Sequence, residues 1–530
     1  MSPAQRTSNV KIFQSICSLF VVGLSVGLAL FGIRERAQAD TPSRYFKIKI
    51  VDAQTGRGVP LVELSTTNDS VYVTDSNGLI AFDEPGLMDG KVFFSIKSHG
   101  YEFPADGFGY RGVPLQVKPG GNAVRKVKRL NIAERICRLT GAGIYRDSIL
   151  LGEKTPLLSP ALSGQVMGQD SALAVLYKGK MMWFWGDTAR PGYPLGNFHT
   201  TGAVATFPKG HTTAEVGLDF RYFTNSDGFA REMCLSKEAG PIWISGLAVI
   251  TSRYKAEGKN EAKKEELYAY YARMEGLGKK LEHGFVKWDD EKNVFQSVKK
   301  LPLTETWRFF DGHPIRLTED GITYLAGGFS FPVVRVPADA IALLDSSSYE
   351  AFTCLNSKGE VRRDAQGNAL YIWQKEAPPL TPEKEAELIA KGQVKPQEAH
   401  FVLHDSAGKL VIAHAGSVTW NPWRKKWLFI ATQKGAKESA LGEIIYSEAD
   451  SPLGPWKGAT KIVTHDRYTF YNPVHHPFLD EAGGKIIYFE GTYTAEFSGN
   501  ATPTPRYNYN QILYRLDLSD PRLKAVTEKK

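Results

Sequence analysis

Four acidic side chains of this 530-residue chain stand at the ends of predicted strands. Asp170 and Asp311 precede such strands, whereas Asp187 and Glu490 follow aromatic-rich ones. Carboxylates that converge on one cleft raise one another's pKa, so one can stay protonated while another is ionised. A protonated and an ionised carboxyl group can act together as acid and as base, or as acid and nucleophile, in the cleavage of a glycosidic bond.

The same residues also have a structural interpretation, which the sequence leaves open. An aspartate at a strand end often accepts hydrogen bonds from the backbone of a turn, and this applies to Asp170 and Asp311. It applies equally to Asp187, which lies between Gly186 and Thr188. Glu490 ends an apolar strand beside Gly491, so an exposed carboxylate at the rim of a sheet is the alternative role for it.

The segment from Tyr471 to Pro477 concentrates polar side chains, because it holds Asn472, His475 and His476 while the whole chain has 11 histidines. Adjacent strand residues point to opposite faces, so at most one of the two histidines can face a cleft. A hydrogen-bonded structural role and a metal-bound role both remain open for it. His313 follows Asp311 by two residues and therefore shares its strand face.

Further candidates for ligand contact are aromatic, cationic or amide side chains near the same strand ends. Trp185 and Trp307 have ring faces that could stack on a sugar, although packing between sheets is the alternative. The Arg308 guanidinium could pair with a planar anionic group such as a uronate. Gln433 ends another aromatic strand.

The elements that must position these residues form five loosely similar units within residues 164–520. Each unit has a first strand, a tight turn, an aromatic second strand and a third strand, which is typical of a propeller blade. A β-sandwich or an irregular β-domain is the alternative. The first strands cover 170–177, 242–250, 311–316, 416–420 and 474–479; the second 179–187, 266–271, 321–326, 426–431 and 485–490; the third 202–207, 285–288, 333–336, 443–447 and 511–515.

In a propeller the first strand of each blade lines the axis and the second runs antiparallel to it. The start of the first strand and the end of the second therefore share one face of the ring. This rule predicts that the four carboxylates, Gln433 and one of His475 and His476 meet in one axial cleft. His313, on the strand face of Asp311, could join them, and Asn472 is a further candidate contact.

One motif carries a resemblance to a known family. The run from Ile444 to Trp456 contains Ser451-Pro-Leu-Gly-Pro-Trp456 and resembles the third-strand signature of five-bladed propeller glycosidases of the arabinanase/β-xylosidase type. The resemblance implies that Asp170 is the general base and that Asp311 orients the acid and tunes its pKa. The acid motif of that family is missing from the fourth unit, and Glu490, in the fifth, is the substitute. The resemblance also implies an optional axial cation such as calcium near a histidine of the fifth blade, and no required cofactor.

Upstream of the units, residues 44–130 alternate with period two between Gly, Asn and Asp turns, which predicts a small antiparallel β-sandwich. The order D-x-x-T-G-x-x-V-P, T-D-x-x-G-x-x-x-F and a strand ending in S-x-G-Y resembles the transthyretin-like (carboxypeptidase regulatory-like) fold. Such modules are usually accessory, so we place no chemistry there.

The expected class is therefore all-β: a sandwich, a connection over 131–163, a five-bladed propeller over 164–520 and a tail over 521–530. One helix is predicted, at Pro382–Lys391 within an insertion.

Residues 1–39 have the order of a secretory signal, with Arg6 and Lys11, an apolar run and the triplet Ala37-Gln-Ala39. A retained membrane anchor is the alternative, so we expect a secreted or periplasmic protein that contacts membrane only if this segment is kept. Removal takes four of 65 basic residues and one of 57 acidic ones, which lowers the net charge from +8 to +5. This mild excess gives no support for a nucleic-acid partner.

Three hypotheses of function follow. The first is a secreted enzyme that hydrolyses a polysaccharide or oligosaccharide, with Asp170, Asp311 and Glu490 as catalytic residues and no metal ligands. The second is a polysaccharide lyase, in which His475 or His476 together with a tyrosine abstracts a proton next to a uronate carboxylate and Arg308 neutralises that carboxylate. The third is a glycan- or protein-binding propeller without catalysis.

The chain has no C-x-x-C, P-loop or H-E-x-x-H motif, which leaves thiolate-zinc, NTPase and zincin functions unsupported.

Overall fold

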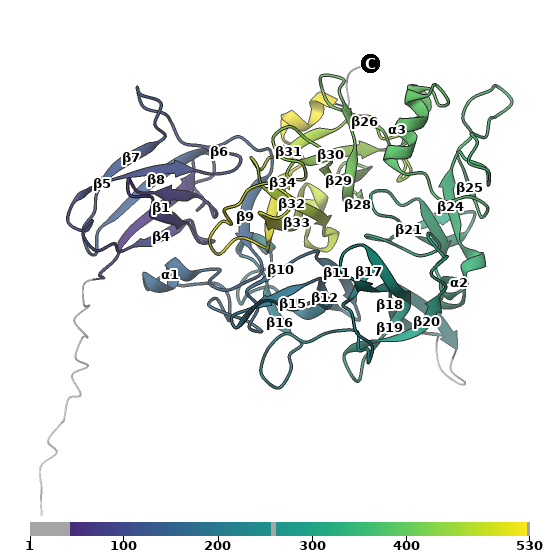
Figure 1. Ribbon diagram of the computed structural model, residues 1–530, viewed down its shortest axis with the longest axis horizontal. Coiled ribbons are helices and arrows are strands. Elements are labelled where there is room, and N and C mark those ends of the chain that lie inside the picture. The colour runs from purple at the N-terminus through teal and green to yellow at the C-terminus, as the bar shows by residue number, and fades with distance from the viewer. Residues whose placement is uncertain (1–42, 256–260, 527–530) are drawn as a thin grey trace, which may run out of the picture. The chain divides into compact units, whose positions relative to one another are not determined.

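The computed structural model describes residues 43–255 and 261–526. The predicted signal at 1–39 and the last four residues of the predicted tail lie outside the described residues. The described residues belong to one compact unit, Ser43–Lys530. They are mostly strand (Figure 1), which confirms the all-β class.

Three short α-helices occur in the described part of the chain: α1 (Arg146–Leu150), α2 (Ala340–Leu344) and α3 (Pro382–Ala390). The third confirms the helix predicted at Pro382–Lys391, and the Thr381 hydroxyl caps it by accepting from the Lys384 backbone N–H at 3.2 Å. None of the helices in the described ranges is long and apolar enough to cross a membrane.

The N-terminal strands form two four-stranded sheets, in the orders β4-β1-β8-β6 and β3-β2-β5-β7. They share one apolar cluster that includes Phe46, Ile48, Phe82 and Phe94. Strand β1 pairs in parallel with β8, so the sheets are not wholly antiparallel as predicted. The bounds are β1 (Phe46–Asp52), β2 (Glu63–Ser65), β3 (Val71–Val73), β4 (Leu79–Phe82), β5 (Lys91–Lys97), β6 (Tyr101–Glu102), β7 (Gly112–Gln116) and β8 (Asn122–Arg129).

The rest of the described chain contains five sheets of four or five antiparallel strands, which we number in chain order. The first sheet consists of β11 (Leu173–Tyr177), β12 (Lys180–Trp185), β15 (Thr201–Thr206) and β16 (Asp219–Tyr222), and the second of β17 (Ile242–Lys255), β18 (Glu261–Glu275), β19 (Lys279–Asp289) and β20 (Val294–Leu301). The third consists of β21 (Ile315–Glu319), β22 (Ile322–Gly327), β23 (Val334–Pro337), β24 (Glu350–Thr353) and β25 (Ile372–Gln374). The fourth consists of β28 (Ala413–Asn421), β29 (Lys426–Gln433), β30 (Ile444–Ala449) and β31 (Thr460–Val463), and the fifth of β32 (Thr469–His475), β33 (Ile486–Thr494), β34 (Asn510–Asp517) and β9 (Glu134–Arg138). Smaller sheets are β10 (Gly168–Gln169) with β13 (Thr188–Arg190) and β14 (Tyr193–Asn197), and β26 (Leu403–His404) with β27 (Leu410–Val411).

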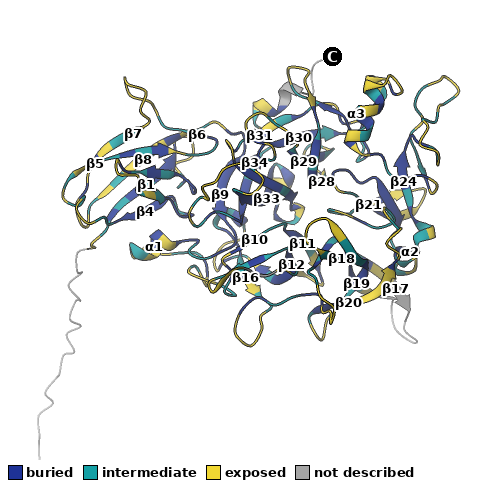
Figure 2. Ribbon diagram, viewed as in Figure 1, coloured by how far each residue is buried: buried dark blue, intermediate teal, exposed yellow. Residues whose placement is uncertain are grey.

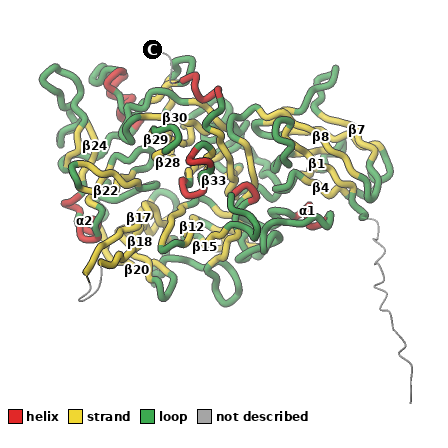
Figure 3. The backbone as a smooth tube through the Cα atoms, turned by 180° about the vertical axis from the view of Figure 1, so that it is seen from behind, coloured by secondary structure: helices red, strands yellow, loops and turns green. Residues whose placement is uncertain are grey.

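Each of the five sheets packs against the next through an apolar cluster, and the fifth packs against the first. Leu173 and Ile244 share the cluster between sheets one and two, for example, and Trp183 and Tyr488 the one between sheets one and five. Figure 2 shows that the strands of these sheets are largely buried and that many of the connections between them are exposed. Figures 1 and 3 show the sheets following one another around a common centre from opposite sides. The packing is therefore closed on itself. The five clusters are between sheets one and two, two and three, three and four, four and five, and five and one.

The fifth sheet is completed by a strand from far upstream. Strand β9 pairs antiparallel with β34, with Cys137 opposite Leu513. The sequence prediction assigned residues 131–163 to a connection, and the structure corrects this for the first part of that range. Because β9 follows the N-terminal sheets directly, it also ties them to the ring: the buried Arg135 donates to the carbonyls of Pro60 at 2.9 Å and His99 at 3.0 Å.

Candidate active site

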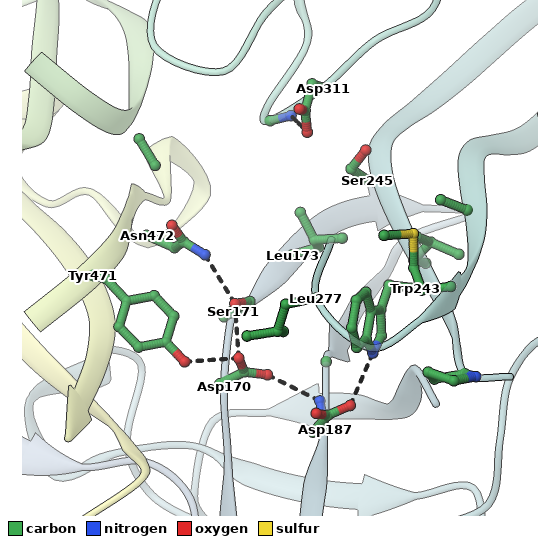
Figure 4. Close-up of a pocket in the computed structure, with 18 of the residues that line it drawn as sticks. Asp170, Ser171, Leu173, Asp187, Trp243, Ser245, Leu277, Asp311, Tyr471 and Asn472 are labelled. Atoms are coloured by element: carbon green, nitrogen blue, oxygen red, sulfur yellow. Dashed lines mark hydrogen bonds between the residues drawn. The ribbon is translucent and has the colours of Figure 1, made fainter. Parts of the chain in front are cut away.

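A cavity of about 1220 Å³ lies where the five sheets meet. Its wall takes Asp170 and Asp187 from the first sheet's strand ends, Trp243 from the second, Asp311 ahead of the third and Tyr471 from the fifth (Figure 4). Gly416, from the fourth sheet, also lines the cavity. The carboxylates of the described residues that line it are Asp170, Asp187, Asp311 and Glu496. Residues more than 300 positions apart therefore share one solvent-filled space.

Asp170 is the hydrogen-bonding centre of the wall. Its Oδ1 accepts from the Asp187 backbone N–H at 2.9 Å, and its Oδ2 accepts from the Tyr471 hydroxyl at 2.7 Å and the Ser171 hydroxyl at 3.2 Å. Asn472 in turn donates to the Ser171 hydroxyl at 2.9 Å. Tyr471 and Asn472 come from β32, so this network joins the first and fifth sheets at the cavity surface.

The backbone around Asp170 is adapted to this network. A Cβ on Gly186 would lie 2.2 Å from the Asp170 Oδ1, so only glycine allows the carboxylate to reach the Asp187 N–H. Four further residues of the cavity wall have left-handed backbone without being glycine. Such conformations cost free energy and tend to cluster at functional sites. They are Ser171 (φ 54°), Asn472 (φ 49°), Phe497 (φ 60°) and Tyr509 (φ 60°).

The Asp187 carboxyl group has a different environment from that of Asp170. Its Oδ1 accepts from the Trp243 indole N–H at 2.8 Å. Burial first, and then the negative charge of Asp170, raise the pKa of Asp187 to about 6. Burial also raises the pKa of Asp170, but its hydrogen bonds to Tyr471, Ser171 and the Asp187 N–H act in the opposite direction. The pair therefore consists of one carboxylate with several hydrogen-bond donors and one neighbour with a single side-chain donor, and burial raises the pKa of both.

Asp311 lies across the cavity from this pair, and Figure 4 shows it on the opposite wall. Its Oδ1 accepts from the Gly312 N–H at 3.0 Å, and although the side chain is open to the cavity, partial burial raises its pKa. Lys280 also lines the cavity and donates to the Tyr270 hydroxyl at 2.8 Å. His313 lines the floor, and burial lowers its pKa to about 3, so it is neutral.

Among the predicted ligand contacts, Asn472 and His313 line the cavity, and Trp307 lines an adjoining cavity of about 230 Å³. The two cavities share Phe309, Asp311 and Phe329. A ligand longer than the main cavity could therefore continue past Asp311 toward Trp307.

The structure places three other predicted contacts away from the cavity. Trp185 is 1% exposed and packs edge-on against Phe220, because it faces the core between sheets one and five. The Arg308 guanidinium stacks over Trp307 and pairs with Glu305 at 3.1 Å, so its charge is already balanced. Gln433 pairs with Ala413 at the end of β29 and does not line the cavity.

The two adjacent histidines are also buried beside the ring rather than open to the cavity. His475 lies between the Thr419 hydroxyl at 2.6 Å and Asp480 at 2.8 Å. His476 lies 2.7 Å from the Glu490 carboxylate. Both side chains are hydrogen-bonded within the protein, which corrects their prediction as substrate contacts.

The prediction that Glu490 is the acid is also corrected. Its side chain is 0% exposed and its Oε1 accepts from the Trp183 indole N–H at 2.7 Å. Glu490 is on β33 of the fifth sheet and Trp183 on β12 of the first. This carboxylate thus joins the two sheets that close the ring, and it has no access to a ligand in the cavity.

The optional axial cation of the sequence analysis stays a prediction. The described residues contain no group of three or more His, Cys, Asp or Glu side chains arranged to hold one. Calcium takes six to eight oxygen ligands, whereas His475 and His476 each already contact a single carboxylate. The mechanism below uses the protein's own residues.

Several residues of the cavity were not predicted. Trp243 lies on the same strand face as Ser245, a predicted first-strand start, so alternation with period two could have found it. Tyr509 and Glu496 lie outside strands, where no sequence pattern indicates which way a side chain points. Lys280 is the second residue of β19, upstream of the third strand predicted at 285–288.

Comparison with known proteins gives only a weak likeness. No family model matches the chain, and no curated protein matches it. Solved structures that match include an exo-β-1,3-galactanase from Phanerochaete chrysosporium (10% identity, 72% of this chain and 64% of that one, TM-score 0.34), an exo-1,5-α-L-arabinanase from a bovine ruminal metagenomic library (12%, 66% and 93%, 0.32) and the GH43_1 enzyme from Xanthomonas citri complexed with xylotriose (11%, 66% and 86%, 0.29). At this level of similarity, function has to be argued from the cavity itself.

The buried contact of Glu490 predicts a stability effect. Glu490→Ala leaves the Trp183 N–H and His476 without their shared acceptor, so the free energy of unfolding should fall by about 2–4 kcal/mol. Chemical denaturation measures this. Glu291→Ala, at an exposed turn position, is the matched control and should change it by less than about 0.5 kcal/mol. Equal effects of the two substitutions would contradict the closure role of Glu490.

The Asp170–Asp187 pair predicts a titration. The Trp243 indole N–H should report the ionisation of Asp187 in ¹⁵N NMR spectra, with a midpoint near pH 6. Asp170→Asn removes the neighbouring negative charge and should move this midpoint to lower pH. An unchanged midpoint in that variant would mean that the two carboxyl groups are not coupled.

Proposed function

We propose that this chain is a glycoside hydrolase that cleaves a polysaccharide or oligosaccharide bound in the cavity. The observation that carries the proposal is the Asp170–Asp187 pair, two neighbouring carboxyl groups with opposite hydrogen-bonding environments in a cavity of about 1220 Å³. Two carboxyl groups whose surroundings separate their protonation states are what glycosidic cleavage requires. Aromatic faces of Trp243, Phe309 and Tyr471 in the same cavity suit the apolar faces of sugar rings.

In this mechanism Asp187 takes the role that the sequence had given to Glu490. Its protonated carboxyl donates the proton to the glycosidic oxygen as the C–O bond breaks. The Trp243 N–H holds one Asp187 oxygen and leaves the other for the substrate. The pKa of about 6 keeps a useful protonated fraction in mildly acidic solution.

Asp170 keeps its predicted role as base. Its carboxylate has about four lone-pair sites, three of which accept from Asp187, Tyr471 and Ser171. A hydrogen bond from Tyr509 also lowers the pKa of Asp170, so the attacking water takes the place of one of these donors before its proton passes to Asp170. The two carboxyl groups have then exchanged protonation states, and exchange with solvent restores them. Asp311 and Lys280, on the opposite wall, would orient the sugar hydroxyls.

The geometry does not favour the lyase alternative. That reaction needs His475 or His476 beside a uronate and a free Arg308, but these side chains are committed to Asp480, Glu490 and Glu305. The cavity wall instead carries four carboxylates, which would repel a uronate. A binding protein without catalysis is the remaining alternative, and it is decided by the variants below.

The finer parts of the prediction belong to the same proposal. The five sheets would be blades of a five-bladed propeller, supported by the apolar clusters that join each sheet to the next. Residues 44–130 would be an accessory transthyretin-like domain. Secretion or periplasmic export rests on the sequence of residues 1–39 alone.

Release of reducing ends from a panel of neutral oligosaccharides and polysaccharides tests the proposal. With the substrate found in that panel, Asp187→Asn and Asp170→Asn should each lower kcat by about 10²–10⁴-fold, while the Kd for the same substrate stays within about threefold. Asp69→Asn, an exposed change on the N-terminal sheets, is the matched control and should leave the rate unchanged.

The pH profile provides a second readout. Because Asp187 must be protonated, kcat/KM should decline as pH rises through about 6. Substrate binding with no bond cleavage, or full activity in Asp187→Asn, would contradict the mechanism and favour a binding protein or a different acid.

A further inference from the structure

One wall of the cavity changes from polar to apolar along its length. Trp243 and Ser245 of β17 face the cavity, and their register partners Ala272 and Tyr270 on β18 face it with them. Met274 continues the same face because side chains alternate along a strand. The sequence along this face of β18 is thus Tyr270, Ala272, Met274, and its polar end is the one beside Asp311 and Lys280.

Beyond Met274 the hairpin between β18 and β19 carries Leu277 between two glycines. Leu277 lines the cavity and is 77% exposed. Phe198 and Phe497 line the cavity with exposed fractions of 44% and 61%. Large apolar side chains held in water around one opening indicate that a ligand covers them.

This wall offers a sugar ring little. Ala272, Met274, Leu277 and Pro241 have no side-chain hydrogen-bonding group for a hydroxyl. The polar side chains beside them already have partners in the protein: Lys280, opposite Met274, donates to the Tyr270 hydroxyl at 2.8 Å, and His199 accepts from the Ile242 N–H at 3.2 Å. The cavity, at about 1220 Å³, also exceeds the ~300–1,000 Å³ that is usual for a small-molecule site. It therefore has room for a second, chemically different part of the ligand beside the sugar.

We propose that the wall formed by Pro241, Trp243, Ala272, Met274 and Leu277 binds an apolar aglycone, an alkyl chain or similar hydrocarbon joined to the sugar through the bond that faces Asp187. The inference rests on the proposed function and names the substrate class of the same site. The aglycone leaves carrying the oxygen that Asp187 protonates, so its position next to Trp243 follows from the indole–Asp187 contact.

The probes are n-alkyl glycosides of galactose, glucose, xylose and arabinose, from ethyl to octyl. Burial of each methylene is expected to raise kcat/KM and lower Kd by about two- to fourfold until the wall is filled. Leu277→Ser and Met274→Ser should reduce this gain per methylene. The control Leu235→Ser, at a 65% exposed leucine that is not part of the cavity wall, should leave it unchanged.

Binding measured by calorimetry separates this inference from the proposed function. If Kd falls with chain length in the native protein but no glycoside is cleaved, the hydrolase assignment fails and the apolar subsite stands. If glycosides are cleaved with no dependence on chain length, the subsite is overturned. A dependence that Leu277→Ser and Met274→Ser both leave intact would place the chain elsewhere and overturn it as well.

Discussion

Closure between the fifth and first sheets is the constraint on which the rest of the structure depends. The cavity exists because five sheets pack in sequence and the last packs against the first, with Trp183 and Tyr488 in one shared cluster. At this contact the buried Glu490 carboxylate accepts from Trp183 and lies against His476. A buried carboxylate without such partners would be strongly unfavourable, so the hydrogen bonds and the closure support each other.

The candidate active site lies directly on the same contact between sheets. Tyr471 and Asn472 of the fifth sheet hold Asp170 and Ser171 of the first. The orientation of Asp170 therefore depends on closure, and the position of Asp187 depends on Asp170 through the backbone N–H that Gly186 makes accessible. Placing two carboxyl groups in this proximity opposes folding, because the negative charge of Asp170 raises the pKa of Asp187. The strained backbone of Ser171, Asn472 and Tyr509 adds to that cost, as is usual where function and not stability sets the geometry.

Much of the ring could be predicted from sequence because its signals are local. Tight turns between aromatic strands indicated the repeating unit, and the rule on strand ends brought Asp170, Asp187 and Asp311 to one cavity. His313 was found because it shares the strand face of Asp311. The rule failed for Glu490, Gln433, His475 and His476, and Trp185, predicted as a sugar contact, is buried in the core instead. Period-two alternation says which residues share a face, but it does not say whether that face meets the cavity or the neighbouring sheet. Strand β9 was missed for a related reason: its partner β34 lies more than 370 residues away, and nothing local in residues 134–138 identifies it.

The central claim is that Asp187 and Asp170 act together on a glycosidic bond in this cavity. A crystal structure of the Asp187→Asn protein with an uncleaved glycoside tests it most directly. If the two residues act in this way, the glycosidic oxygen lies within about 2.6–3.2 Å of the residue 187 side chain, with a water molecule near Asp170. A glycoside bound with its glycosidic oxygen remote from both residues, or bound outside the cavity, would contradict it.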